Sequence, residues 1–133
     1  MFLLDTSVLT RLRNPAIRQR IDELDRAGLA RTAMTDLEIG FSARNAAEWD
    51  RLLMALGAFR RLDVEARHFV RARQVQRGLA DRGLKGRKIP DLLVAAVAET
   101  ESLAVVHYDT DFDHIAAFTR QPTEWIVPRG SID

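Results

Sequence analysis

The sequence predicts an α/β fold with a mainly parallel central sheet flanked by helices on both faces, in three layers. Short apolar runs alternate with segments of helical pattern along all 133 residues. Strand and helix in alternation favour a parallel sheet between two layers of helices. A chain of this length suits one compact domain over residues 1–133, and it shows no internal repeat, low-complexity tract or linker.

The expected elements, in chain order, are a strand at 2–5, helices at 6–13 and 14–28, a strand at 29–33, helices at 35–45 and 47–58, a strand at 61–63, helices at 63–83 and from 90, a strand at 103–108, a helix at 111–118 and a strand at 124–127. The first strand is apolar until Asp5, and Thr6 or Ser7 can cap the short helix that follows. The second helix begins with an Asn-Pro pair, the usual order of cap and proline. Residues 35–38, Thr-Asp-Leu-Glu, match a capping box that opens the third helix.

The later elements show clearer apolar patterns. Asp63 can cap the long helix, on which Phe69, Ala72, Val75 and Leu79 make an apolar stripe. The helix that starts at Pro90 is apolar nearly all round over residues 92–98, so it belongs in the interior. The run at 103–108 indicates a second buried strand.

Composition limits the function. With no cysteine, any bound metal must be held by oxygen or imidazole, and oxygen ligands favour Mg²⁺ or Mn²⁺. The longest apolar stretch, residues 92–98, is far short of the roughly 20 residues that a membrane span needs, and the amino terminus lacks the pattern of a signal peptide. We therefore expect a soluble, cytoplasmic protein with no membrane partner.

Charge divides along the chain. Residues 60–88 carry 10 basic and 3 acidic side chains, whereas residues 89–133 carry 2 basic and 8 acidic ones. One region could attract phosphates while the other binds cations. The alternative is a solvated arginine-rich helix face beside an ordinary acidic tail.

Four acidic residues stand where apolar runs stop or helices begin: Asp5, Glu38, Asp91 and Asp109. Carboxylates at the carboxyl ends of parallel strands point into the crevice where such sheets bind ligands. Each also has a structural alternative: Asp5 and Asp91 could serve only a helix start, and Glu38 only its capping box. In the run around Asp109, we expect Asp111 to cap the last helix and Asp109 to point inward.

Electrostatics favours a joint site for these acids. Two carboxylates about 5 Å apart repel by roughly 3 kcal/mol at an effective dielectric constant of 20. Four such groups cannot stay ionised together without a cation. Magnesium or manganese would remove the conflict and leave coordination positions for a substrate phosphate, so the pattern favours metal-dependent phosphodiester chemistry.

Four motifs resemble those of the PIN-domain ribonucleases, and most closely the VapC-type toxins of toxin-antitoxin modules. They are Leu-Asp-Thr-Ser-Val at 4–8, Thr-Asp-Leu-Glu at 35–38, Ile-Pro-Asp-Leu-Leu-Val-Ala-Ala at 89–96 and His-Tyr-Asp-Thr-Asp-Phe at 107–112. The similarity spans nearly the whole chain in order and spacing. It implies a PIN-like fold and a magnesium- or manganese-dependent endoribonuclease that leaves 5′-phosphate and 3′-hydroxyl ends.

The same resemblance implies roles for single residues. Asp5 and Asp91 would be the principal metal ligands, Glu38 and Asp109 would complete the cluster directly or through water, and Asp111 is a fifth candidate. Thr6 or Ser7 would hold an Asp5 oxygen or a metal-bound water, with helix capping as the plain alternative. The cation would activate a water for in-line attack on an RNA phosphorus while a metal stabilises the departing 3′ oxygen.

Substrate and partner contacts are expected elsewhere on the chain. Lys85, Arg87 and Lys88 could hold RNA phosphates beside the metal, with Arg67 and Arg71 as more distant helpers. The three histidines lack the spacing of a zinc site and should be structural or surface residues. The resemblance implies a cognate antitoxin and a homodimer or toxin-antitoxin hetero-oligomer, for which the helices of residues 35–59 offer apolar surface.

Two other functions are open. The first strand also resembles that of haloacid-dehalogenase-type phosphatases, in which Asp5 would be the nucleophile, although Ser7 stands where their second acid usually lies. The other alternative is a PIN-like module that binds RNA without cleaving it. This module would bind RNA tightly whether or not EDTA is present, whereas the ribonuclease requires cleavage that EDTA stops.

Overall fold

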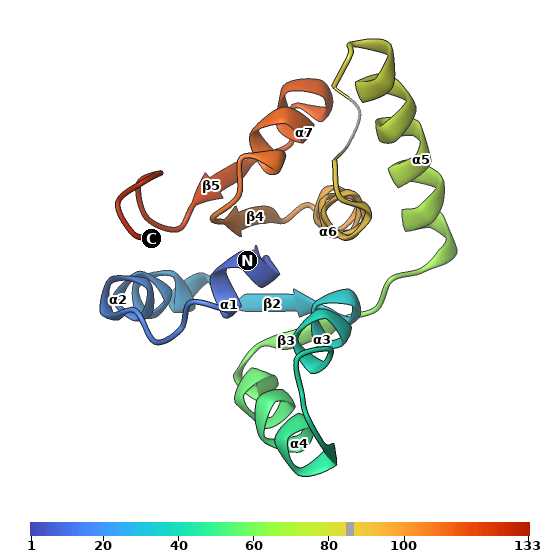
Figure 1. Cartoon of the computed structure of the whole chain (residues 1–133). Coiled ribbons are helices and arrows are strands. Elements are labelled where there is room, and N and C mark those ends of the chain that lie inside the picture. The colour runs from blue at the N-terminus through green and yellow to red at the C-terminus, as the bar shows by residue number, and fades with distance from the viewer. Residues whose placement is uncertain (85–86) are drawn as a thin grey trace.

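The computed structural model describes residues 1–84 and 87–133. The helices are α1 (Thr6–Leu9), α2 (Pro15–Leu24), α3 (Ala33–Gly40), α4 (Ala46–Ala55), α5 (Ala66–Asp81), α6 (Ile89–Thr100) and α7 (Asp111–Thr119), with short 3₁₀ turns η1 (Asp25–Ala27) and η2 (Leu56–Ala58). The strands are β1 (Phe2–Leu4), β2 (Leu29–Thr32), β3 (Arg60–Leu62), β4 (Ala104–His107) and β5 (Thr123–Trp125). Figure 1 shows their arrangement.

The five strands form one sheet in the order β3-β2-β1-β4-β5. Every described pair is parallel, including β1 beside both β2 and β4. The predicted α/β class with a mainly parallel sheet is therefore confirmed. The carboxyl ends of β1 and β4 lie next to each other, which is the position where a parallel sheet collects functional side chains.

Helices cover both faces of the sheet, as predicted. Leu3 and Val105 point to the face packed against α5, α6 and α7, whereas their neighbours Leu4 and Val106 point to the face covered by α1, α2 and η2. Successive residues of a strand face opposite sides, so each of these short strands contributes to both cores. The helix α6 is buried over Asp91–Ala98, in agreement with its apolar sequence.

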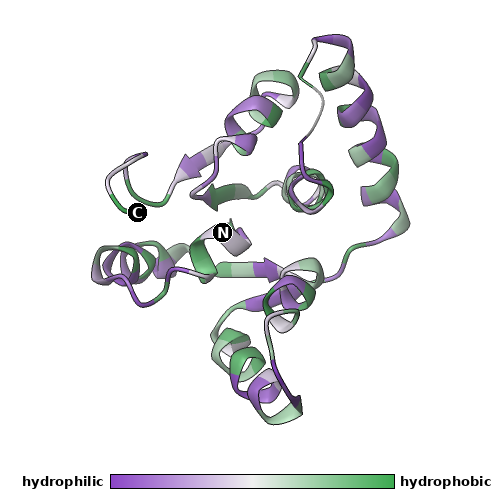
Figure 2. Ribbon diagram, in the orientation of Figure 1, coloured by the Kyte–Doolittle hydropathy of each residue, from purple (hydrophilic) through white to green (hydrophobic). Residues whose placement is uncertain are grey.

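The long helix α5 is amphipathic, and Figure 2 shows purple and green residues alternating along it. Its buried face is His68, Ala72, Val75 and Leu79. Phe69 was expected in this stripe but is 49% exposed. His68 takes that place because its Nδ1 accepts a hydrogen bond from the backbone N–H of Glu65 at 2.8 Å, as half of a capping box.

Helix starts differ from the prediction at three places. α1 is capped by Asp5, not by Thr6 or Ser7, and it ends at Leu9, four residues before Arg13. α3 is capped by Thr32, so the predicted capping box at 35–38 is wrong and lies inside the helix. α5 is capped by Glu65 rather than Asp63, because three residues without regular structure separate β3 from the first residue of the helix, Ala66. None of the helices in the described ranges has the length and apolar character of a membrane span.

Candidate active site

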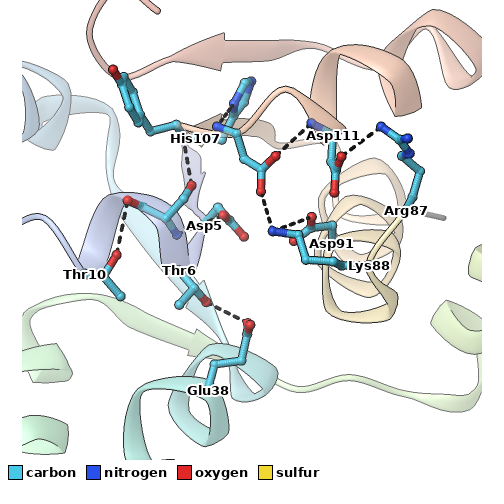
Figure 3. Close-up of polar contacts among 12 residues, drawn as sticks. Asp5, Thr6, Thr10, Glu38, Arg87, Lys88, Asp91, His107 and Asp111 are labelled. Atoms are coloured by element: carbon cyan, nitrogen blue, oxygen red, sulfur yellow. Dashed lines mark hydrogen bonds and ion pairs between the residues drawn. The ribbon is translucent and has the colours of Figure 1, made fainter. Parts of the chain in front are cut away.

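The predicted acidic residues come from four segments at the carboxyl edge of the sheet. Asp5 directly follows β1, Asp109 lies two residues beyond β4, Asp91 is in the first turn of α6, and Glu38 is on α3. Oxygen atoms of Asp91, Asp109 and Asp111 lie within 4.8 Å of one another. We call these three residues the aspartate cluster. Figure 3 shows Asp5 beside it and Glu38 on the side of Thr6.

Asp91 is the most deeply buried member of the aspartate cluster, with a residue exposure of 5%. Its Oδ2 atom has no hydrogen-bond partner among the described residues, and the nearest cation, Lys88 Nζ, is 3.9 Å away. Burial, followed by the charge of Asp5, raises the pKa of Asp91 to about 8. A buried carboxylate without a donor is costly, so this oxygen needs a proton or a bound cation.

The other two members of the aspartate cluster are each paired with a basic residue. Lys88 Nζ donates to Asp109 Oδ2 at 2.8 Å, and Arg87 donates to Asp111 Oδ1 at 2.9 Å. Burial opposes the ionisation of Asp109, but the hydrogen bonds from Lys88 and from the backbone N–H of Asp111, together with the charge of Lys88, outweigh burial and lower the pKa of Asp109. Asp109 is therefore a stable anion at neutral pH.

Asp111 was expected to cap α7 and does not. It is the first residue of that helix, whereas Asp109 Oδ1 accepts the backbone N–H of Asp111 at 2.9 Å. The N-cap of α7 is Thr110, which makes no side-chain capping bond. The bond to the backbone N–H of Asp111 comes instead from Asp109, whose other oxygen points inward. Its Oδ2 atom faces Lys88 inside the aspartate cluster.

Asp5 caps α1, and its carboxyl group also lies beside the aspartate cluster. It is 3% exposed, and its Oδ2 accepts the backbone N–H of Ser7 at 2.9 Å, which caps α1. Burial raises the pKa of Asp5 despite this hydrogen bond, and the negative charge of Asp109 adds to the effect. The carboxyl group of Asp5 is thus close enough to the aspartate cluster to sense its charge.

Glu38 is held by Thr6, a residue that was expected to hold Asp5. The hydroxyl of Thr6 donates to Glu38 Oε1 at 2.8 Å and lies 2.9 Å from the hydroxyl of Thr35. The hydroxyl of Thr6 is therefore used for Glu38 and not for Asp5, which is held by the backbone N–H of Ser7. Burial raises the pKa of Glu38, and the charge of Asp5 raises it further, against the hydrogen bond from Thr6.

The basic residues divide into two groups. Arg87 and Lys88 contact the aspartate cluster, which sequence reasoning missed, although the spacing of Lys88 three residues before Asp91 on one helix start was a usable signal. Arg67 pairs with Glu65 and Glu101, and Arg71 pairs with Glu99. The proposed role of these two arginines as RNA helpers thus competes with intramolecular ion pairs, and Lys85 lies outside the described residues.

His107 is a buried structural residue that holds the backbone of Asp109. It is fully buried, its Nδ1 accepts the backbone N–H of Asp109 at 3.2 Å, and its ring lies 5.0 Å from the rings of Phe112 and Trp125. Burial lowers the pKa of His107 to about 4. A neutral imidazole therefore fixes the backbone that carries Asp109.

The residues present fit a divalent cation. The three residues of the aspartate cluster all offer carboxylate oxygen, the ligand type that Mg²⁺ and Mn²⁺ prefer. The unpartnered Oδ2 of Asp91 is a buried acceptor that lacks a donor within the described chain. A cation at this place would satisfy that atom and offset the repulsion among the acids.

The comparisons with known proteins agree with this arrangement. The family model described as PIN domain matches residues 2–118. Ribonuclease VapC51 of Mycobacterium tuberculosis (strain ATCC 25618 / H37Rv) is 56% identical over 133 residues, covering 99% of this chain and 97% of the relative. Ribonuclease VapC21 of the same strain is 44% identical over 137 residues, covering 98% and 96%.

Solved structures show the same fold. A complex of VapBC2 from Rickettsia felis with a DNA fragment from their promoter matches with a TM-score of 0.78 at 17% identity, covering 92% of this chain and 96% of the other. VapBC-5 from Mycobacterium tuberculosis, a member of the VapBC family of toxin-antitoxin systems, matches with a TM-score of 0.62 at 27% identity, covering 96% and 98%. The chain therefore belongs to the PIN-domain family, and within it to the VapC ribonucleases.

Proposed function

We propose that the chain is a magnesium- or manganese-dependent endoribonuclease that acts as the toxin of a toxin-antitoxin pair, with residues 1–133 as one catalytic domain. The observation that carries this proposal is the buried Asp91 carboxylate, which faces Asp109 and Asp111 and has an oxygen without a donor in the described chain. A divalent cation is the partner that this group of oxygens lacks.

Each segment has a separate task in the proposed site. Asp91, Asp109 and Asp111 would hold the cation, Asp5 would complete the ligand set from the end of β1, and Glu38 would join it from α3. When bound, the cation would supply Lewis acidity, which lowers the pKa of a water and stabilises charge on phosphoryl oxygens. Ser7 and Thr6 fix Asp5 and Glu38, so these acids are oriented before the substrate arrives.

Arg87 and Lys88 would change partners during the reaction. In the structure their side chains pair with Asp111 and Asp109. A cation bound to the same carboxylates would take over this pairing, and the two basic side chains could then contact RNA phosphates at the edge of the site. This gives the predicted RNA-binding roles of Arg87 and Lys88 a physical basis.

Cleavage of a labelled RNA with magnesium, with and without EDTA, tests the proposal. The wild-type protein should cleave with magnesium or manganese only and leave 5′-phosphate and 3′-hydroxyl ends, whereas Asp91→Asn should be inactive. Asp22→Asn, an exposed change on α2, is the matched control. Tight RNA binding without any metal-dependent cleavage would instead favour the non-catalytic module.

The phosphatase alternative is set aside because the family match is to the PIN domain. Ser7 also has a different use from a second acid, since its Oγ accepts the backbone N–H of Tyr108 at 2.9 Å. This bond ties α1 to the segment that carries Asp109. The nucleophile role once considered for Asp5 is therefore replaced by that of a ligand.

The proposed partner is a cognate antitoxin, in a hetero-oligomer that could also contain a toxin homodimer. Several of the similar solved structures are VapBC complexes. The surface of α3 and α4 exposes Leu37, Phe41 and Met54 at 68%, 92% and 79%. Such an apolar surface suits burial under a protein partner in the cytoplasm, where the RNA substrate would also be found.

A further inference from the structure

A groove beside the aspartate cluster has no role in the site described above. It has a volume of about 630 Å³ and runs along the carboxyl-terminal half of α5 to the start of α6. Figure 1 shows these two helices side by side. Leu79, Leu84 and Leu92 contribute apolar surface, while Arg73 and Arg77 line it with basic side chains.

Arg73 and Arg77 differ from the other arginines of α5. Arg67 and Arg71 are held by glutamates, as described above. Arg73 and Arg77 are exposed and make no ion pair or side-chain hydrogen bond with any residue of the ranges 1–84 and 87–133. Because these two side chains share one face of α5, they present two uncompensated charges to the same groove.

Arg87 connects this groove to the aspartate cluster. Its side chain lines the groove and its guanidinium also donates to Asp111 Oδ1 at 2.9 Å. The same guanidinium has a buried Nε without a partner among the described residues. A polymer lying in the groove would therefore reach the carboxylates at one end.

We propose that this groove is an RNA subsite in which Arg73 and Arg77 contact phosphates of the strand next to the bond that is cleaved. The inference rests on the proposed ribonuclease function and adds where the substrate lies. Positive charge on the wall suits a phosphate backbone, and the apolar floor suits ribose or unstacked bases of a single strand.

Binding of a fluorescein-labelled, single-stranded 12-nucleotide RNA tests this, measured by fluorescence anisotropy in EDTA over a range of salt concentrations. The test variant is Arg73→Gln with Arg77→Gln. The matched control is Arg26→Gln with Arg60→Gln, which removes the same charge from exposed positions next to the amino ends of β2 and β3, at the opposite edge of the sheet from the carboxylates. Urea unfolding midpoints for all three proteins establish that the folds are equal.

The test variant should lose about tenfold in affinity, and its salt dependence should weaken by about 1.4 in the slope of log K against log salt, since each phosphate contact on a single strand contributes roughly 0.7. The control should stay near the wild type. Equal behaviour of the test and control variants would overturn the proposal, and so would a wild type that does not bind this RNA.

The groove and the ribonuclease function can fail separately. A wild type that binds the RNA through Arg73 and Arg77 but never cleaves with magnesium would refute the function and keep the groove as an RNA site. If the wild type cleaves RNA with magnesium and the double variant cleaves it equally well, the ribonuclease function is kept and the groove is refuted as an RNA site. If the double variant keeps its RNA affinity but no longer co-purifies with a co-expressed antitoxin, the groove is a protein site and the proposal is wrong.

Discussion

Replacing Asp91 by Asn should stabilise the metal-free protein while removing its response to magnesium. In the folded chain the pKa of Asp91 is raised to about 8 from the ordinary 3.8, mainly by burial. At pH 7 the carboxyl group therefore stays protonated in the native state but ionises on unfolding. The unfolded state gains from that ionisation, so Asp91 lowers the free energy of unfolding.

The sign of the pH dependence follows from proton counts. Between 3.8 and about 8 the folded protein holds a proton on Asp91 that the unfolded chain has released. Stability must therefore fall as pH rises through this window. His107, whose pKa is lowered to about 4, acts in the opposite direction between 4 and 6.5, because the unfolded chain then binds the extra proton. His107 is present in both proteins. Its contribution therefore cancels when the free energy of unfolding of the wild type is subtracted from that of Asp91→Asn.

The size of the destabilisation by Asp91 follows from its pKa in the folded and unfolded chain. Each pH unit between 3.8 and 7 contributes about 1.4 kcal/mol, which gives an upper limit of roughly 4 kcal/mol at neutral pH. The asparagine side chain would itself be a buried polar group, so only part of this cost is recovered by the substitution. We therefore expect Asp91→Asn to raise the free energy of unfolding by roughly 2 kcal/mol at about pH 7, and by much less at about pH 5.

Urea unfolding in EDTA at both pH values measures this, with the exposed Asp22→Asn as control. Addition of magnesium should then raise the stability of the wild type and leave Asp91→Asn unchanged, since binding to the native state stabilises it by mass action. A variant that is less stable than the wild type at both pH values would refute the reasoning. So would a gain that does not depend on pH.

Three further changes test the contacts around the site. Thr6→Val removes the hydroxyl that donates to Glu38, so it should lower the initial rate of RNA cleavage while Thr6→Ser keeps it; equal rates for both variants would contradict this. Arg31→Met breaks a buried ion pair with Asp36 and two hydrogen bonds to backbone carbonyls. It should lower the free energy of unfolding in urea by roughly 3 kcal/mol, and a loss below about 1 kcal/mol would contradict this. Lys88→Gln removes the cation nearest to Asp109, so magnesium affinity in calorimetry should rise severalfold, and an unchanged affinity would show that Lys88 does not compete with the metal.

The sheet and its acids were predictable because their signal is local. β1 and β4 are short apolar runs, and each is followed within two residues by an aspartate. In a parallel sheet, the carboxyl ends of the strands lie at one edge, so strand type and strand end put Asp5 and Asp109 at the same edge. That they are neighbours depends also on the pairing of β1 with β4, which the sequence did not show. The burial of α6 followed in the same way from a helix that is apolar nearly all round.

Helix caps were harder to predict because several polar residues compete for each start. Thr32 and Thr35 are both good caps, and the sheet decides between them, since β2 ends at Thr32. Glu65 was preferred to Asp63 because a buried His68 completes its capping box. Neither choice depends on local preference alone.

The partners of the arginines could not be read from the sequence. Arg67 and Arg71 are neutralised by Glu101 and Glu99, which lie 34 and 28 residues away along the chain. Their neighbours Arg73 and Arg77 have no such acids opposite them among the described residues. Which basic residues remain available for RNA is therefore a property of how α5 packs on α6.

Helix capping and metal binding are usually weighed as alternatives for an aspartate at a helix start, yet here they support each other. Asp5, the N-cap of α1, accepts the backbone N–H of Ser7. Asp109, the residue before the N-cap of α7, uses Oδ1 for the backbone N–H of Asp111 and keeps Oδ2 for the interior of the aspartate cluster. A carboxylate fixed by one oxygen loses little further rotamer entropy when the other binds a cation. The capping bonds also favour the ionised form, which a metal needs. An aspartate that accepts a backbone N–H at a helix start, at the carboxyl edge of a parallel sheet, is for this reason a better candidate ligand than an aspartate without such a bond.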